Sequence, residues 1–174
     1  MIDIKTFFEQ SEGKWFTQRT QYNLTEKQVE NDQAELTVEL LPADDRAIAD
    51  LYSETSSQFQ ADLPSNVASA KISWDVEGNK GANLILLLPE DEAKQQGQLI
   101  QKSMNPEQPA TIGNFVIGED EALTLSTPTA SNSLIKERVW FAHPNLRLRT
   151  VWQETDMGQQ GSVLFYSEIR RMNS

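Results

Sequence analysis

Polar and apolar side chains alternate along most of this chain, a pattern typical of β-strands with one buried face. The alternation is clear from Trp15 to Leu24 and from Glu35 to Leu40, where β-branched and aromatic residues are frequent. Further runs of the same kind are separated by turn residues such as Gly, Asn, Asp and Pro. They are Ala68–Val76, Ala82–Leu88, Gln98–Lys102, Gly113–Ile117, Ala122–Ser126, Leu134–Phe141, Arg147–Glu154 and Ser162–Arg170.

Two segments have helical spacing instead. Ile4–Gln10 carries its apolar residues on one side and follows Asp3, a candidate N-cap, while Arg46–Tyr52 is a short amphipathic segment. We expect the polar stretch Ser53–Asn66 to end the second helix and form a loop. Because strands and helices do not alternate and no segment repeats, the pattern predicts one all-β domain over residues 1–174. Its about ten short strands fit an antiparallel barrel or sandwich with two short helices.

Composition excludes several classes of function. The 174 residues include no Cys and one His, so disulfides, thiolate nucleophiles and zinc clusters are ruled out and we expect no metal site. Acidic residues outnumber basic ones by 26 to 15, and the resulting net charge of −11 argues against nucleic-acid binding. The longest apolar run, Leu84–Leu88, has five residues and is too short for a membrane span. We therefore expect a soluble, intracellular protein.

The most informative polar residues are cations inside predicted strands. Arg147 and Arg149 share one strand face at a separation of about 7 Å, and two guanidinium groups so placed can clamp carboxylates. Arg19 adds a cation in the first strand. One interpretation is a cup lined by aromatic side chains that holds an organic acid. The other is that the arginines face solvent and pair with the surplus acids, and spacing alone leaves both open.

Strand alternation also sorts the residues around these cations. In Lys136–Phe141 it places Glu137 on one face with Val139, and Trp140 on the opposite face with Arg138. A one-residue bulge would reverse such an assignment, so the face that lines a pocket stays open at this point.

Four short motifs follow one another along the chain: Trp15-x-x-x-Arg19-Thr20, Ser73-Trp74-Asp75, Glu137-Arg138-x-Trp140-Phe141 and Asn145-Leu146-Arg147-Leu148-Arg149-Thr150. With Phe7-Phe8 before them and Ser167-Glu168-Ile169-Arg170 after them, they resemble the S/U-type phycobiliprotein chromophore lyases (CpcS/CpeS-like bilin lyases). The resemblance extends from about residue 3 to residue 171. No single motif is specific, but the ordered set is fairly specific.

The resemblance implies a fold and an activity. It implies a lipocalin-like calyx of about ten antiparallel strands that binds a linear tetrapyrrole, phycocyanobilin or phycoerythrobilin, non-covalently. The protein would attach this bilin by a thioether bond to a cysteine of an apo-phycobiliprotein. The bilin is then the bound substrate and no other cofactor is implied. Such lyases act as homodimers or as heterodimers with a paralogue, in the cytoplasm or the plastid stroma.

Site roles follow from the chemistry of a bilin, which has two propionates and a conjugated apolar body. We expect Arg147 and Arg149 to clamp the propionates, with Arg19 as a third cation. A carboxylate would hold the pyrrole N–H groups and assist proton transfer, with Glu137 preferred and Asp75 second. Trp74 and Trp140 offer flat faces for stacking, and Glu168 and Arg170 are expected to be structural.

Two alternatives remain beside the lyase hypothesis. The chain could be a non-catalytic lipocalin-like carrier of a tetrapyrrole or a fatty acid. It could also be a structural β-barrel without a ligand, in which Arg147 and Arg149 face water.

Overall fold

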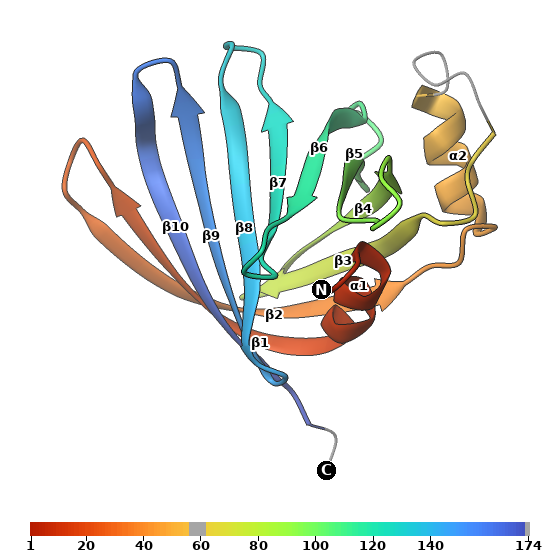
Figure 1. Ribbon diagram of the computed structural model, residues 1–174. Coiled ribbons are helices and arrows are strands. Elements are labelled where there is room, and N and C mark those ends of the chain that lie inside the picture. The colour runs from red at the N-terminus through yellow and green to blue at the C-terminus, as the bar shows by residue number, and fades with distance from the viewer. Residues whose placement is uncertain (56–61, 173–174) are drawn as a thin grey trace.

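Across residues 1–55 and 62–172, which the computed structural model describes, ten strands form one closed antiparallel barrel (Figure 1). Each strand pairs with its neighbours along the chain, and β1 pairs with β10 to close the ring. The strands are β1 (Gly13–Asn23), β2 (Val29–Leu40), β3 (Ala68–Val76), β4 (Asn79–Pro89), β5 (Gln96–Ser103), β6 (Thr111–Ile117), β7 (Leu123–Pro128), β8 (Leu134–His143), β9 (Leu146–Thr155) and β10 (Gly158–Arg170).

The predicted all-β barrel with ten strands and two short helices is confirmed. Ala68–Val76 matches β3 at both ends, whereas β2 begins at Val29, several residues before the predicted start. The second helix, α2 (Arg46–Thr55), extends into the predicted loop Ser53–Asn66, of which residues 56–61 lie outside the described part. The longer β2 follows from its pairing with β1, which continues past the apolar alternation as far as Val29 opposite Tyr22.

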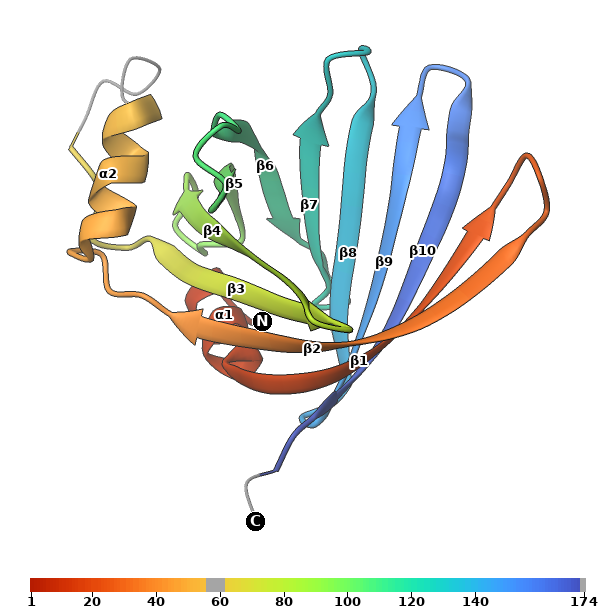
Figure 2. The ribbon, with the colours of Figure 1, turned by 180° about the vertical axis from the view of Figure 1, so that it is seen from behind.

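The two ends of the barrel differ. The turns that join β1 to β2, β7 to β8 and β9 to β10 lie at the end where the strands spread apart, whereas the turn between the shorter strands β3 and β4 lies lower (Figures 1 and 2). Helix α1 (Ile4–Ser11) lies at the other end, where its Ile4 N–H donates to the Lys94 carbonyl at 3.0 Å. Its N-cap is Asp3, which accepts from the Thr6 N–H at 2.8 Å as predicted. The barrel is therefore closed at one end and open at the other.

Two apolar cores hold the helices in place. Inside the barrel, Phe7 and Phe8 of α1 pack against inward-facing strand residues that include Trp15, which is 0% exposed. Outside the barrel, α2 covers the outer face of β4 and β5, where Ile48 and Leu51 are buried. The run Leu84–Leu88 is buried throughout because its side chains enter both cores alternately. In the described residues, neither helix is long and apolar enough to cross a membrane.

Gly97 marks a close approach between β4 and β5. A Cβ atom at this position would lie 2.0 Å from the Leu88 carbonyl oxygen, which is backbone and cannot rotate away. We predict that Gly97→Ala lowers the free energy of unfolding by about 1–3 kcal/mol, because the two strands would have to separate. Urea denaturation measures this loss, with Gln98→Ala on the same strand as the control. Equal stability of the two variants would contradict the close approach.

Candidate functional site

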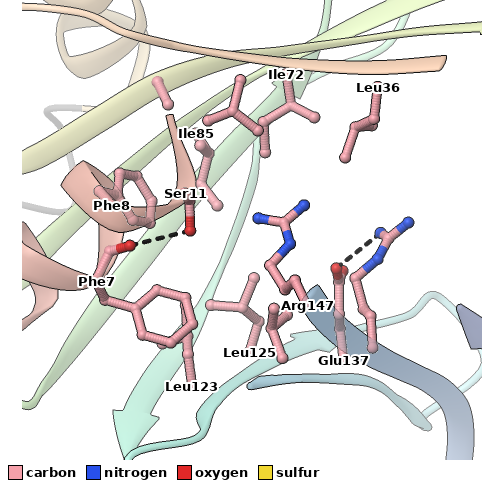
Figure 3. A pocket seen from close by; sticks show the side chains of 14 residues that line it. Phe7, Phe8, Ser11, Leu36, Ile72, Ile85, Leu123, Leu125, Glu137 and Arg147 are labelled. Atoms are coloured by element: carbon pink, nitrogen blue, oxygen red, sulfur yellow. Dashed lines mark hydrogen bonds and ion pairs between the residues drawn. The ribbon is translucent and has the colours of Figure 1, made fainter. Parts of the chain in front are cut away.

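A cavity of about 310 Å³ lies inside the barrel, in the range typical of small-molecule sites. Its walls come from β1–β5 and β7–β10 and include Trp74, Glu137 and Arg149. A smaller hollow of about 60 Å³ continues toward α1 and shares Glu137 and Arg149 with the larger one. Figure 3 shows Arg147 and Glu137 projecting into this hollow, opposite Ile72, Ile85 and Leu36.

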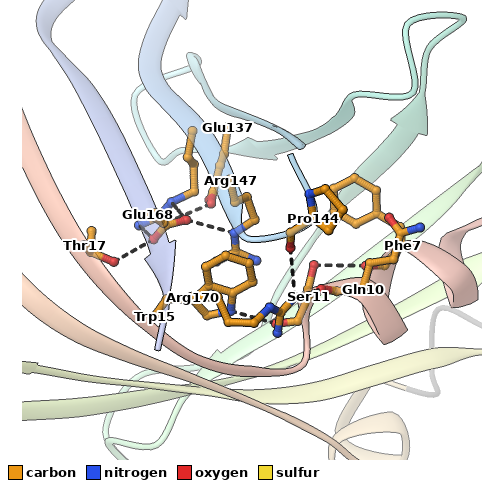
Figure 4. A network of polar contacts seen from close by, with 11 residues as sticks. Phe7, Gln10, Ser11, Trp15, Thr17, Glu137, Pro144, Arg147, Glu168 and Arg170 are labelled. Atoms are coloured by element: carbon orange, nitrogen blue, oxygen red, sulfur yellow. Dashed lines mark hydrogen bonds and ion pairs between the residues drawn. The ribbon is translucent and has the colours of Figure 1, made fainter. Parts of the chain in front are cut away.

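Glu168 of β10 is the centre of a buried polar network (Figure 4). Its side chain is 0% exposed, and one carboxylate oxygen accepts from the Thr17 hydroxyl at 2.9 Å while the other accepts from Arg147 Nε at 2.9 Å. Arg149 lies on the same carboxylate at 3.5 Å. One carboxylate therefore joins β1, β9 and β10 and neutralises charge on two neighbouring guanidinium groups.

Arg149 connects this network to the cavity. Its Nη1 donates to Glu137 Oε1 at 3.0 Å, and its guanidinium carbon lies 3.8 Å from the centre of the Tyr166 ring. Arg149 Nε is buried, and the described residues offer it no hydrogen bond. Its nearest acceptor is Glu168 Oε1 at 3.5 Å, so this nitrogen belongs to the buried ion pair and not to the cavity surface.

Arg147 lies deeper, between the network and the closed end of the barrel. It is 6% exposed, and its guanidinium stacks over the Trp15 indole at 5.0 Å. The Trp15 ring N–H donates to the Ser11 carbonyl of α1 at 2.9 Å. Arg170 covers the other side of the ring at 4.2 Å and donates to backbone carbonyls at the end of α1 (Figure 4). Arg170 is therefore structural in this arrangement, as the resemblance implied.

Burial and charge act in opposite directions on these groups. Burial raises the pKa of Glu168, but Arg147 and Arg149 outweigh it and hold the pKa below its ordinary value. Burial likewise lowers the pKa of Arg149, and Glu137 and Glu168 together raise it above the ordinary value. At Arg147 burial dominates, so its pKa is lowered despite the nearby Glu168. Glu168 and Arg149 are consequently held in their charged forms.

We call the smaller hollow next to α1, with Arg147, the closed half of the cavity, and the part of the larger cavity around Arg19 and Trp74 the open half. Arg19 is already paired. Its Nε donates to Asp32 Oδ1 at 2.9 Å, and its Nη2 is ion-paired with the second oxygen of the same carboxylate. The hydrogen bond with Asp32 raises the pKa of Arg19. Trp74 lines the cavity wall nearby, and its ring packs closely against Gly81 of the next strand.

The structure brings together five of the predicted site residues. These five are Arg19, Trp74, Glu137, Arg147 and Arg149, and each lines at least one of the two hollows. The two strand arginines face the interior, so the interpretation in which they face solvent is not what the structure shows. Among the residues that the structure describes, no group of His, Asp or Glu side chains is arranged to hold a metal ion.

Two predicted placements are wrong. Trp140 lies on the outer face of the barrel, with Arg138 stacked over its ring at 4.7 Å, because Val139 points inward and its neighbours must point outward. Asp75 also faces outward, since it neighbours the inward-facing Trp74, and its Oδ1 accepts from the Gly78 N–H in the hairpin turn at 2.9 Å. Neither side chain lines either hollow.

Four residues of the site were missed from the sequence. Glu168 was assigned a structural role only, and Thr17, Asp32 and Tyr166 were assigned none. The available signal was alternation, because Thr17 shares a face with Arg19, and Tyr166 shares one with Glu168. What joins the two sets is the register of β1 on β10, which opposes Thr17 to Glu168 and is not readable from either strand alone.

Comparison with known proteins identifies the family. A family model described as CpeS-like protein matches residues 3–171. The chain belongs to this family. Among its CpeS-like relatives, the chromophore lyase CpcS/CpeS of Thermosynechococcus vestitus is 37% identical, over 97% of this chain and 93% of that protein. The phycocyanobilin lyase subunit CpcS of Picosynechococcus sp. is 29% identical, over 85% of this chain and 76% of that protein.

A solved structure has the same fold as this CpeS-like chain. The S-type phycobiliprotein lyase CPES from Guillardia theta superposes with a TM-score of 0.77 at 24% identity, covering 99% of this chain and 95% of that one. The likeness supports the barrel architecture and the position of the helices, independently of the sequence match.

The buried network predicts a pH-dependent stability. Because the pKa of Glu168 is lowered in the folded chain, its ionised form stabilises the fold above about pH 4.5, and this contribution is lost as the pH falls toward the folded value. Glu168→Gln should lower the free energy of unfolding by about 3–5 kcal/mol at pH 7, since two buried guanidinium groups lose their partner. Below pH 4.5 the free energy of unfolding should fall less steeply in this variant than in the unsubstituted chain. Urea titrations of both proteins at pH 7, 5 and 3.5 measure the difference. An unchanged slope would contradict the assignment.

Proposed function

We propose that this protein is a bilin lyase. It binds a linear tetrapyrrole, phycocyanobilin or phycoerythrobilin, non-covalently in the barrel cavity and attaches it to a cysteine of an apo-phycobiliprotein. The observation that carries the proposal is the pair of inward-facing guanidinium groups, Arg147 and Arg149, beside a mostly apolar hollow that continues into a larger cavity of mixed polarity. The names of the relatives, chromophore lyase and phycocyanobilin lyase subunit, support the reaction.

The polar groups of the cavity match those of a bilin. Arg149 lines both hollows, and Arg147, two residues earlier on the same strand face, lines the smaller one. Both can donate to propionate oxygens. Glu137 uses one oxygen for Arg149, and its side chain is 30% exposed toward the cavity, so it can accept from pyrrole N–H groups. Trp74 offers an apolar face to the rings.

Attachment requires a thiol that this chain does not have. The sequence contains no Cys, so the nucleophile comes from the acceptor protein. Its sulfur bonds to the exocyclic carbon of the ring A ethylidene group, the carbon–carbon double bond becomes single, and the thiol proton is delivered to the neighbouring ring carbon. Glu137 is placed to relay that proton, and the rest of the cavity orients the bilin.

The proposed reaction needs no further cofactor. Addition of a thiol to a double bond consumes no oxidant and no reductant, and every atom of both reactants is kept. The acceptor thiol must stay reduced until the bilin adds. This favours a reducing compartment such as the cytoplasm or the plastid stroma.

We also infer that the protein works as a homodimer or as a heterodimer with a paralogue. The support is that one relative is named a lyase subunit. Light scattering of the purified chain, alone and with a paralogue, tests this inference. A mass of about one chain under both conditions would contradict it.

An attachment assay tests the proposed function. The purified chain, phycocyanobilin and an apo-phycocyanin β subunit are mixed, and the covalent product is followed by absorbance and by fluorescence on a denaturing gel. A native-like adduct that forms only with this chain supports the lyase. A bilin spectrum changed by the chain without faster adduct formation indicates a carrier, and no spectral change indicates a barrel that does not bind bilin.

Arg149→Gln should weaken binding of phycocyanobilin about tenfold to a hundredfold, because a charge-assisted hydrogen bond to a propionate is lost. The matched control is Arg138→Gln, whose guanidinium is ion-paired with Asp120 on the outer face of the barrel. Titration of bilin absorbance measures both. Arg149 is a cleaner test than Arg147, whose loss would leave the buried Glu168 without its closest cation.

Glu137→Gln should separate binding from chemistry. The amide keeps the shape of the side chain but cannot relay a proton, so we expect the rate of attachment to fall about a hundredfold. The dissociation constant of the bilin should change far less. Single-turnover attachment with bilin already bound measures the first quantity, and an unchanged rate would exclude the proton relay.

A further inference from the structure

The arginines in the two halves of the cavity differ in how they are paired with carboxylates. In the closed half, Arg149 divides its donors between Glu137 at 3.0 Å and Glu168 at 3.5 Å. In the open half, Asp32 engages both Nε and Nη2 of Arg19 in a side-on pair. The arginine of the open half is therefore fixed at two points by one carboxylate, whereas Arg149 divides its donors between two carboxylates.

Charge within the cavity is balanced. The guanidinium groups of Arg19, Arg147 and Arg149 are matched by three carboxylates, Asp32, Glu137 and Glu168. Glu168 is fully buried and Glu137 lies on Arg149, so both act on the closed half. Asp32 is the carboxylate in this set that neutralises the open half. Without it, the cavity would have a net positive charge next to its mouth.

The Arg19–Asp32 pair is also the one that a ligand can exchange. Its side chains are 35% and 30% exposed, whereas Glu168 is 0% exposed. A partly hydrated pair is held weakly, so Arg19 can be released when its partner is removed or displaced. Arg19 and Asp32 face each other across the β1–β2 pairing, and both line the larger cavity.

We propose that Asp32 is a specificity-determining residue that keeps carboxylates away from the open half of the cavity. By occupying Arg19, it leaves Arg147 and Arg149 as the preferred site for an acidic ligand group. A dicarboxylate tetrapyrrole is then held in one register, with its propionates toward the closed end and its apolar rings toward the mouth. The role rests on the proposed function, because it concerns how the same ligand is placed.

The test compares phycocyanobilin with its dimethyl ester, which keeps the rings but has no carboxylates. In the unsubstituted chain the diacid should bind more tightly than the ester. Asp32→Asn should raise that preference about threefold to fivefold, because Arg19 becomes available as an additional partner for a propionate. In an Arg19→Gln background the same substitution should change nothing, which isolates the pair as a double-mutant cycle.

The matched control is Glu35→Gln, on the same strand as Asp32 but facing outward, where its carboxylate is ion-paired with Arg171. It should leave both affinities unchanged. Circular dichroism and a second variant, Asp32→Ser, guard against misfolding of one protein. A preference that stays the same or falls in both Asp32 variants, or that rises equally without Arg19, overturns the role of Asp32. If the unsubstituted chain binds neither compound, the proposed function fails as well.

Discussion

A single buried carboxylate organises this barrel. Glu168 has no exposed surface, yet it neutralises two guanidinium groups and accepts a hydroxyl from a third strand. Removing the carboxylate, or the arginines that neutralise it, would leave an uncompensated charge in a low-dielectric interior, which is among the most destabilising changes that a protein can undergo. The network therefore ties β1, β9 and β10 together in one register.

The same constraint gives the cavity its polarity. Because Glu168 lies beneath them, Arg147 and Arg149 are held side by side although their charges repel each other. Trp15 and helix α1 close the barrel behind the pair, so its donors are directed toward the cavity and away from bulk water. An anion that reaches them meets preorganised guanidinium groups whose desolvation has already been compensated within the fold.

Strand alternation accounts for how much of the site could be predicted. It placed Arg147 and Arg149 on one face. It also puts Glu137 and Trp140 on opposite faces of one strand, and Trp74 and Asp75 on opposite faces of another, so only one residue of each pair can face the cavity. The structure keeps Glu137 and Trp74 inside and leaves Trp140 and Asp75 outside, in agreement with that rule. Most of the strands were recognisable for the same reason, since one face is buried, whereas β4 is a continuous apolar run because both of its faces are buried.

Pairing between strands accounts for what could not be predicted. Thr17 meets Glu168 across 151 residues of sequence, and Arg19 meets Asp32 only because the β1–β2 hairpin sets that register. No local pattern encodes either partner. Since the chain has no thiol, the proposed reaction takes its nucleophile from the acceptor protein, and this chain contributes the position of the ligand and the proton relay at Glu137. The partners of each arginine, fixed by register, are then what decides the chemistry.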